Sequence, residues 1–479
     1  MTQSAALVLR SWLGGEPPFE RIAVTPSVTQ PSRSASAVSS FVDRLASTGQ
    51  RLRLYGVVAF ALLLMAIGAR VVDTYQHHVE FDFLTQDGRG YYVYLPALLI
   101  EGNLRIEKQM TEHWGRESNM VPLLLSHRSP RGYVVDPYPV GMALTLSPAF
   151  LLAHGITLLV HPLTPSPLFT PDGYTVLYQL LDAVWVLAIG WGMMALTDRL
   201  IVRHFHVPPA TIAGGILLYW VGSNYIWYYL REMFMVHIVS AFWVVASVTL
   251  ILRIVAKAQA REQYGRDMAI LGFVFGMAFI CRPTNAFIAP FFVWAIIRIH
   301  QAGGLAQFAR TAPAALAFFI PAGIQMAIWH RISGSLIFYS YGHERFYFLH
   351  PALWQTLFHI KHGVFIWTPL YVLSVIGIVW WTRRPNHQIE PALGCFILSG
   401  LLLWYVNSSW WCWWFADSFG ARAWIELAPL FIMGLVFALN ALRTASKAVR
   451  TTGIAFIVVC LVLNWVLLGL YQLRLIPRG

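Results

Sequence analysis

The sequence predicts an all-α, polytopic transmembrane helical bundle. Hydrophobic residues make up 57% of the 479 residues and charged residues only 12%, whereas a soluble domain carries about 25% charged residues. Apolar runs of about 20 residues, long enough to cross a hydrocarbon core of ~30 Å, recur from Val57 onward. These runs are continuously apolar, whereas a transmembrane β-barrel needs short segments of alternating polarity. Composition and run length therefore predict membrane-spanning helices.

The first part of the chain differs from the rest in composition. Residues 1–50 are rich in Ser, Thr and Pro and contain no continuous apolar core of the kind found in a signal peptide. We expect them to form a disordered cytoplasmic tail, followed by one transmembrane domain over residues 51–479. The four cysteines show neither a disulfide framework nor a C-x-x-C metal spacing.

Basic residues predict the topology. The excess of 34 Lys and Arg over 22 Asp and Glu would suggest a nucleic-acid partner in a soluble chain, but cytoplasmic loops of membrane proteins carry the same bias. We therefore predict no nucleic-acid partner. The basic residues outside the apolar runs form six clusters, at Arg51 with Arg53, 199–206, 253–266, 298–310, Arg383 with Arg384, and 443–450.

If all six clusters face the cytoplasm, an even number of crossings must separate each cluster from the next. This parity predicts about eleven spans, with the C-terminus outside. The spans are expected near residues 54–73, 174–197, 208–229, 233–253, 268–282, 284–299, 311–330, 362–382, 390–407, 422–443 and 452–473.

One apolar stretch does not fit this count. Residues 138–160 are long enough to span, yet counting them would place the cluster at 199–206 outside. We expect a juxtamembrane or re-entrant helix on the outer side, which is permitted where its backbone is buried in protein. Residues 74–173 then form one long outer loop. A helix in this loop is predicted by apolar residues at helical spacing, namely Tyr92, Leu95, Leu98 and Leu99. Two shorter outer loops are expected at 331–361 and 408–421.

With this topology, the polar residues that stand out from the apolar chain converge on the outer side. Ionisable groups near membrane depth are costly, so they usually pair with each other or mark a site. An ion pair between Arg231 and Glu232 is one such alternative. The outer set comprises Asp73, Glu80, Asp82, Asp87, Tyr225, Tyr228, Arg231, Glu232, His237, Arg282, His343, Glu344, Arg345, Lys361, His362, Asp417, Arg422 and Glu426.

Four tryptophans at 410, 411, 413 and 414 stand just before Asp417, Arg422 and Glu426. An aromatic belt at the membrane interface would explain the rings alone. A binding site explains both, because aromatic faces pack on sugars or an isoprenoid chain and arginine forks bind phosphate. The chain has no Walker or G-x-G-x-x-G loop for a nucleotide. A lipid-linked sugar phosphate, delivered by the membrane bilayer, therefore fits as the donor.

The chain resembles the GT-C superfamily of polytopic membrane glycosyltransferases. The stretch "QDGRGYYVYLPALL" looks like the acidic motif that opens the first outer loop in that superfamily, with Asp87 in the acidic position. The pieces "DPYPVGMALTLSP", "CRPTNAF", "GSLIFYSYGHERF", "KHGVFIWTPL" and "WWCWWFADSFGARAWIELAPL" look like those of bacterial members. The resemblance implies a transferase of the bacterial inner membrane that moves sugar from a polyprenyl-phosphate carrier on the periplasmic face.

This chain departs from the pattern in one place. Many relatives carry a second acid directly after the first, where this chain has Gly88, so Asp82 or Glu80 becomes the candidate for that role. Asp87 is the predicted general base, because desolvation near the bilayer strengthens a carboxylate as a base. Arg89 or a neighbouring tyrosine is expected to orient it.

The remaining predicted site residues bind substrate. Arg422 and Arg345 rank first for the charge on the departing phosphate, before Lys361 and Arg282. Arg282 also reads as part of a helix break at a tight turn, and His237 as a structural histidine. The other predicted contacts to substrate are Tyr91, Tyr92, Arg89, His343, Trp411, Trp414 and Asp417.

The acceptor class stays open among glycans, lipids and proteins. Outer carboxylates suffice to hold a divalent cation, but no spacing requires one, so a divalent cation stays open and no residue is assigned as a metal ligand. Alternative functions are a transporter or flippase for lipid-linked glycans, a glycan polymerase or ligase, and a non-catalytic scaffold. Transporters are usually built from repeats and line a path to both faces, whereas this chain shows no repeat and a one-sided polar set.

Overall fold

The computed structural model describes residues 45–77, 82–113, 120–164, 166–308, 311–384 and 390–476. Within these ranges, the chain forms helices and connecting segments with two isolated β-bridges and no strand, so the all-α prediction is confirmed for this part. Most of the predicted tail, residues 1–44, lies outside the described residues, as does Glu80.

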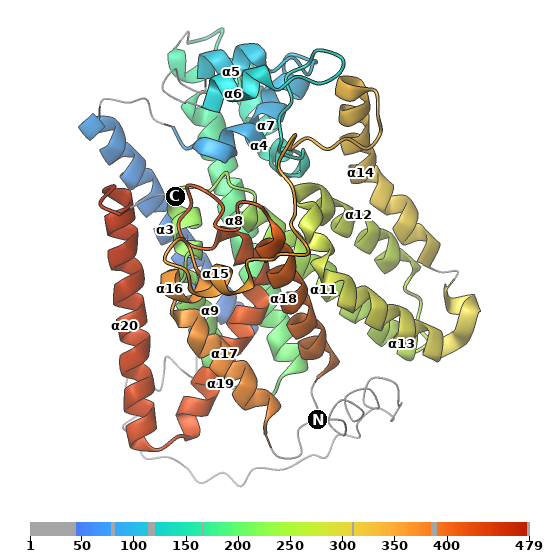
Figure 1. The fold of residues 1–479 in the computed structure, drawn as a ribbon, viewed down its shortest axis with the longest axis vertical. Coiled ribbons are helices and arrows are strands. Elements are labelled where there is room, and N and C mark those ends of the chain that lie inside the picture. Colours follow the sequence, from blue (N-terminus) through green and yellow to red (C-terminus); the bar gives the residue numbers. More distant parts are fainter. Residues whose placement is uncertain are drawn as a thin grey trace.

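Helices follow one another along the whole described chain (Figure 1). They are α3 (Thr48–His77), α4 (Gln86–Leu99), α5 (Glu107–His113), α6 (Met120–Ser126), α7 (Gly141–Val160), η1 (Pro167–Phe169), α8 (Val176–His204), α9 (Pro209–Gly222), α10 (Tyr225–Leu230), α11 (His237–Gln259), α12 (Gly265–Cys281), η2 (Pro283–Ile288), α13 (Ala289–Phe308), α14 (Ala312–Ser333), α15 (Leu353–Phe358), α16 (Val364–Trp367), α17 (Leu370–Thr382), α18 (Pro391–Ser409), η4 (Arg422–Leu427), α19 (Ala428–Thr444) and α20 (Lys447–Gln472).

Nine helices in the described part are long and apolar enough to cross a membrane. Three expected spans form shorter helices, because α9, α12 and α17 have 14, 17 and 13 residues. The apolar stretch that the topology left uncounted, α7, does reach spanning length. The count of eleven therefore stays a prediction, while a multi-helix architecture of membrane type is present.

Helix α7 lies beside the first part of α8 and runs in the opposite direction. The indole nitrogen of Trp185 donates to the carbonyl of Thr145 at 2.8 Å, and His154 Nδ1 lies 2.6 Å from the hydroxyl of Tyr178. At its first residue, Gly141, a Cβ would lie 2.4 Å from the backbone nitrogen of Cys281, the last residue of α12. In Figure 1, α4, α5, α6 and α7 lie together at one end of the bundle, called here the site end.

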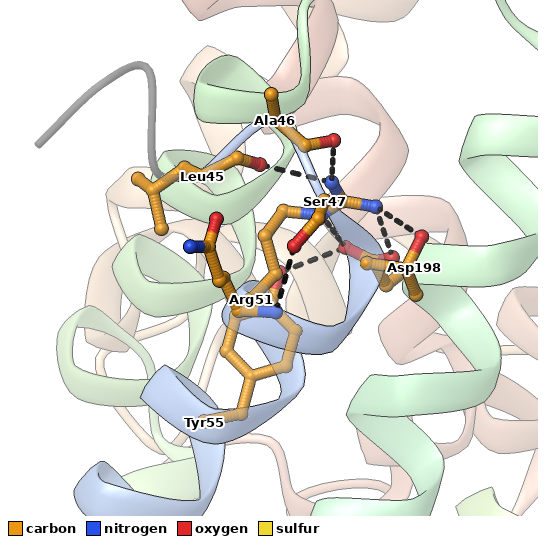
Figure 2. Close-up of polar contacts among 8 residues, drawn as sticks. Leu45, Ala46, Ser47, Arg51, Tyr55 and Asp198 are labelled. Carbon is orange, nitrogen blue, oxygen red and sulfur yellow. Dashed lines mark hydrogen bonds and ion pairs between the residues drawn. The ribbon is translucent and has the colours of Figure 1, made fainter.

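At the opposite end, a buried ion pair joins the start of α3 to the end of α8. Figure 2 shows Arg51 bonded to both carboxylate oxygens of Asp198, at 2.8 and 2.9 Å, with Tyr55 donating to the same carboxylate at 2.9 Å. Arg51 also donates to the carbonyls of Leu45 and Ala46. Leu45 and Ala46, which the sequence assigned to the tail, therefore contact the bundle, and α3 begins at Thr48, inside the predicted tail.

Other boundaries shift for the same kind of reason. The first long helix, α3, continues to His77, four residues beyond its predicted span, because near its end Arg70 and Arg231 both bond to Asp73. Arg231 therefore pairs with Asp73, and not with Glu232 as in the alternative considered from the sequence. Helix α4 forms where helical spacing predicted it, but it is buried on nearly all sides instead of on one face.

Candidate functional site

Asp87 and Arg422 form an ion pair at the site end. Asp87 lies in the first turn of α4, and Arg422 is the first residue of η4. Their closest atoms, Oδ2 and Nη2, are 2.8 Å apart, and the side chains stay 17% and 12% exposed. The other terminal nitrogen of Arg422, Nη1, is buried and has no hydrogen-bond partner among the described residues. The predicted base, Asp87, and the first-ranked phosphate ligand, Arg422, are therefore in direct contact. One guanidinium nitrogen of Arg422 has no partner among the described residues.

Two glycines close to Asp87 allow neighbouring segments to pack tightly on the first turns of α4. A Cβ on Gly88 would lie 3.2 Å from the Cβ of Phe234, in the segment between α10 and α11. A Cβ on Gly90 would lie 2.3 Å from the ring of Tyr138, a distance that real Cβ atoms do not reach. The glycines of the D-G-R-G motif are therefore needed because two other segments pack directly on α4.

Tyr138 joins the site from the segment before α7. Its backbone N–H donates to Asp136 Oδ1 at 3.0 Å, its carbonyl accepts from the hydroxyl of Tyr94 at 2.9 Å, and its ring packs on Tyr91 with centroids 4.5 Å apart. Burial raises the pKa of Tyr138 well above its ordinary value, and the charge of Asp87 raises it further. The hydroxyl therefore keeps its proton within the electrostatic reach of Asp87.

Asp136 holds this segment in place. It is 4% exposed, and its Oδ2 has no partner in the part of the chain that the structure describes. Burial raises the pKa of Asp136 well above its usual range. Asp136 and Tyr138 both lie in the stretch "DPYPVGMALTLSP", but neither is among the site residues predicted from the sequence. The available signal was an Asp two residues before a Tyr between prolines, which is typical of an Asx-turn.

A second polar group lies among η2, η4 and α11. Arg282 Nη1 and His237 Nδ1 lie 2.9 and 3.0 Å from Glu426 Oε1. Arg282 is in an extended conformation between α12 and η2, so the expected helix break is present. His237 is buried and hydrogen-bonded, as expected of a structural histidine. Because Glu426 binds the guanidinium of Arg282, this ion pair connects the end of α12 to η4.

Arg89 does not orient Asp87 as expected. Its guanidinium bonds to the carboxylate of Asp82 and to the carbonyl of His113. Asp82 also accepts the backbone N–H of Leu84 at 2.7 Å. Asp82 and Arg89 therefore secure the entry into α4, and the ion-pair partner of Asp87 is Arg422.

The two adjacent tyrosines of the motif, Tyr91 and Tyr92, lie on different sides of α4. Tyr91 contacts Tyr138 and belongs to the site. Tyr92 is fully buried, donates to the carbonyl of Gly173 at 2.8 Å and packs against Phe150 and Phe234. Tyr92 therefore packs in the core, and its contact with substrate stays a prediction.

Glu232 is a site residue that the predicted catalytic set omits. It lies in the segment on which Gly88 packs, is 6% exposed, and its Oε2 has no partner within the described ranges. Burial raises the pKa of Glu232 to about 7. The positive charge of Arg422 lowers this pKa, and the negative charges of Asp87 and Asp417 raise it. A carboxyl that titrates near neutral pH therefore lies within the electrostatic reach of the Asp87–Arg422 pair.

The two shorter predicted loops join each other. Phe346 pairs with Trp410 in a β-bridge, and the backbone N–H of Trp411 donates to the carbonyl of Arg345 at 3.1 Å. The guanidinium of Arg345 lies 5.6 Å from the ring centre of Tyr347. His343 and Arg345 are both exposed. Arg345, which shared first rank with Arg422, therefore lies in an exposed loop and packs on a ring.

The tryptophan-rich segment has a strained backbone. Phe415 and Ala416 have φ angles of 59° and 49°, a left-handed conformation that residues other than glycine rarely adopt. The carbonyl of Trp414 accepts a hydrogen bond from His362 at 2.7 Å, and Lys361 lies 5.5 Å from the ring centre of Trp414. Trp411 is 42% exposed and Asp417 accepts from the hydroxyl of Tyr471 at 2.6 Å. Such strain persists where the surroundings fix it, and it is common at functional sites.

An apolar cavity of about 540 Å³ lies between α7, α8, α11, α12 and α14. Its lining includes Thr145 and Met277, each four residues from the contact between Gly141 and Cys281. Because four residues make about one helical turn, the cavity begins about one turn away from Arg282. The arrangement places space for an apolar chain beside a cluster of charges.

The charged groups that the structure describes at the site pair with each other and form no metal-binding cluster. In the described ranges, no three His, Cys, Asp or Glu side chains form a group that suits a metal ion. Asp87 and Glu426 are instead matched by Arg422 and Arg282.

The chain was also compared with known proteins. No protein-family model and no curated protein matches it. Its function has to be inferred from the geometry of the site.

Proposed function

We propose that this protein is a membrane glycosyltransferase that moves a sugar from a polyprenyl-phosphate donor to an acceptor on the outer face of the membrane. The observation that carries this proposal is the Asp87–Arg422 pair with its unpartnered Arg422 Nη1. A carboxylate suited to accept a proton and an arginine nitrogen suited to bind phosphate lie side by side. Both come from motifs on which the resemblance to GT-C enzymes rests.

The reaction is a displacement at the anomeric carbon of the donor sugar. Asp87 takes the proton of the acceptor hydroxyl, whose oxygen forms the new bond to the anomeric carbon. The bond from that carbon to the phosphate oxygen breaks, and its electron pair leaves with the polyprenyl phosphate. Arg422 Nη1 donates to the phosphate as this charge develops, while Nη2 keeps its bond to Asp87. In this proposal the hydroxyl of Tyr138, which lies within the electrostatic reach of Asp87, donates to the carboxylate and holds it in place.

The apolar cavity supports a lipid-linked donor. Trp185, Phe242 and Trp243 are among its lining residues, and it opens between helices of membrane type. A polyprenyl chain in this cavity would bring its phosphate toward the charged cluster, one turn away. The bilayer itself would then deliver the donor, so the site needs no loop for a nucleotide.

The distribution of basic residues supports an outward-facing site. Helices α8, α11 and α19 carry Arg203 with His204, Lys257 and Arg443 in their last turns. Their first turns lie near the site, because Gln179 bonds to Phe83 and His237 to Glu426. By the positive-inside rule, the basic ends face the cytoplasm of a bacterial inner membrane and the site faces the periplasm.

The test is mass spectrometry of the surface glycans, lipids and proteins of a host that lacks the gene. The host is complemented with the wild-type chain, with Asp87→Asn, or with Asp172→Asn. Asp172 is a matched control, because its Oδ1 accepts the backbone N–H of Tyr174 away from the pair and asparagine keeps that acceptor. Equal amounts of each variant in the membrane fraction are a precondition.

We expect a sugar that appears with the wild-type chain and with Asp172→Asn, and disappears with Asp87→Asn. The modified molecule then also identifies the acceptor class. If Asp87→Asn restores the sugar fully, Asp87 is not the base, and a transporter of lipid-linked glycans becomes the better explanation.

A further inference from the structure

The segment between α14 and α16 exposes an unusual number of large apolar side chains. Leu349, Ile360 and Trp354 are 90%, 78% and 70% exposed. Trp354 and Phe358 stand one turn apart on the same face of α15, with ring centroids 4.4 Å apart. The exposed apolar side chains in this part are Leu336, Ile337, Tyr339, Tyr347, Phe348, Leu349, Leu353, Trp354, Phe358 and Ile360.

This segment is bonded to the last turns of α18. The hydroxyl of Tyr405 donates to the carbonyl of Phe348 at 2.8 Å, and the indole nitrogen of Trp404 donates to the carbonyl of Leu353 at 3.1 Å. The backbone N–H of Ala352 donates to the carbonyl of Ser408 at 2.7 Å. Residues 347–360, called here the strap, are therefore held at a fixed height on α18.

The length of α18 sets that height relative to a bilayer. Its 19 residues give a helix of ~28 Å at ~1.5 Å per residue, close to the ~30 Å of a hydrocarbon core. Trp404 and Tyr405 lie in its last turns, where tryptophan and tyrosine side chains form the aromatic belt at the level of the lipid headgroups. Both donate to the strap, so the strap lies at the same level.

The irregular backbone of the strap excludes a position inside the hydrocarbon core of the bilayer. Apart from the six residues of α15, its backbone is irregular, and an irregular backbone exposed to lipid does not occur within the hydrocarbon region. The apolar side chains of the strap continue the exposed apolar surface of α18, which includes Leu398, Leu401 and Leu402. The exposed basic groups His350, His359 and Lys361 lie in or next to it.

We propose that the strap is a membrane-interface element that lies in the headgroup region of the leaflet at the site end, with Leu349, Trp354 and Ile360 inserted among lipids. Apolar side chains in the interface with basic groups beside them are typical of segments that rest on a lipid surface. The partner of this surface is the bilayer, and neither an acceptor molecule nor a second copy of the chain covers it. The inference does not depend on the proposed transferase activity.

The test measures the depth of single positions in nanodiscs of phosphatidylcholine and phosphatidylglycerol. All four native cysteines are buried, so one introduced surface cysteine can be labelled selectively with an environment-sensitive fluorophore. The test position is Leu349→Cys. Glu112→Cys on α5 serves as the aqueous control, because that side chain is 54% exposed. Val459→Cys in the middle of α20, at 53% exposure, is the control for the hydrocarbon core.

Quenching is compared for lipids that carry a spin label near the headgroup or deep in the acyl chain, and for iodide in the water. At Leu349→Cys we expect stronger quenching by the shallow label than by the deep one, and weak quenching by iodide. Val459→Cys should show the reverse order of the two lipid labels, and Glu112→Cys should respond to iodide only.

A response of Leu349→Cys like that of Glu112→Cys would overturn the proposal, because the strap would then stand in water. Protection from all three quenchers would overturn it too, since a protein surface would then cover the strap. Wild-type and labelled chains of equal monodispersity exclude misfolding, and the lipid arms can be repeated without phosphatidylglycerol to separate apolar insertion from charge attraction.

Discussion

Two arginine–aspartate pairs lie at opposite ends of this bundle, and they differ in how fully their hydrogen bonds are satisfied. The pair of Arg51 and Asp198 is 1% and 0% exposed, and every guanidinium nitrogen of Arg51 donates a hydrogen bond (Figure 2). The pair of Arg422 and Asp87 keeps some exposure, and Arg422 Nη1 has no partner within the described residues.

We expect this difference to separate a structural pair from a functional one. A buried ion pair offsets its desolvation only when its hydrogen bonds are complete. The pair of Arg51 and Asp198, called here the inner pair, meets that condition. An incomplete pair has a donor available for a ligand, so its cost is recovered only when a ligand binds. Substitutions in the inner pair should therefore lower the stability of the fold, and substitutions in the pair of Arg422 and Asp87 should lower turnover.

The largest expected effect is on the inner pair. Asp198→Asn leaves the charge of Arg51 buried without its counter-charge, which should destabilise the protein by about 3–5 kcal/mol. Thermal unfolding in detergent should show the loss as a lower midpoint, while the specific activity of the folded fraction stays unchanged. The double variant Arg51→Met/Asp198→Leu removes both charges and should recover most of the stability. A normal midpoint for Asp198→Asn would contradict the structural role of this pair.

Arg422→Ala should act on the reaction instead. Removal of a donor that stabilises developing charge typically costs ~10²–10³ in kcat, equivalent to about 2.7–4 kcal/mol. Initial rates in proteoliposomes loaded with a polyprenyl-phosphate sugar measure it. Arg422→Lys keeps the charge but loses the fork that reaches Asp87 and the phosphate together, so it should fall between alanine and wild type. Unchanged kcat and donor KM in Arg422→Ala would assign the phosphate to another cation.

A smaller loss is expected from Tyr138→Phe. A hydrogen bond to a charged group contributes about 1.5–3 kcal/mol, so loss of the hydroxyl beside Asp87 should lower kcat by ~10- to 100-fold. The donor KM should change little, because Tyr138 positions the base and does not hold the phosphate. Tyr178→Phe is the matched control, since that hydroxyl bonds to His154 outside the site. Equal kcat values for the two variants would remove Tyr138 from the mechanism.

Local patterns in the sequence predicted local features. Helix α4 follows from apolar spacing, and Asp87 stands out as a charge in an apolar chain next to glycines. The pairing of Asp87 with Arg422 was not predictable, because it depends on how α4 and η4 pack across the whole fold. The same holds for Arg89, whose nearest acid in the folded chain is Asp82.

The effect of burial on single carboxyl groups was not predicted for a related reason. Asp136 looks like an ordinary loop acid in the sequence and Glu232 like a partner of Arg231, and only packing removes water from them. Apolar length alone also did not define the role of α7. That helix is long enough to span, yet it lies against the first part of α8 with its first residue on the end of α12.

The smallest expected effect concerns the charge of Glu232. Its pKa is raised from an ordinary 4.5 to about 7, so the carboxyl is neutral below about pH 7 and negative above it. A negative Glu232 competes with the donor phosphate for Arg422, and the apparent donor KM should therefore rise as pH increases through about 7. Because the folded pKa lies above the unfolded one, this carboxyl contributes stability that is fully present below about pH 4.5 and is lost as pH rises from there through about 7.

Glu232→Gln keeps the shape of the side chain and cannot ionise. Donor KM and the unfolding midpoint, both measured across neutral pH, should therefore vary less in this variant than in the wild-type chain. A pH dependence of KM that is identical in both chains would show that another group titrates at the site. A KM that flattens while the midpoint does not would separate the two roles, since Glu232 would then act on the donor through Arg422 without contributing to the stability of the fold.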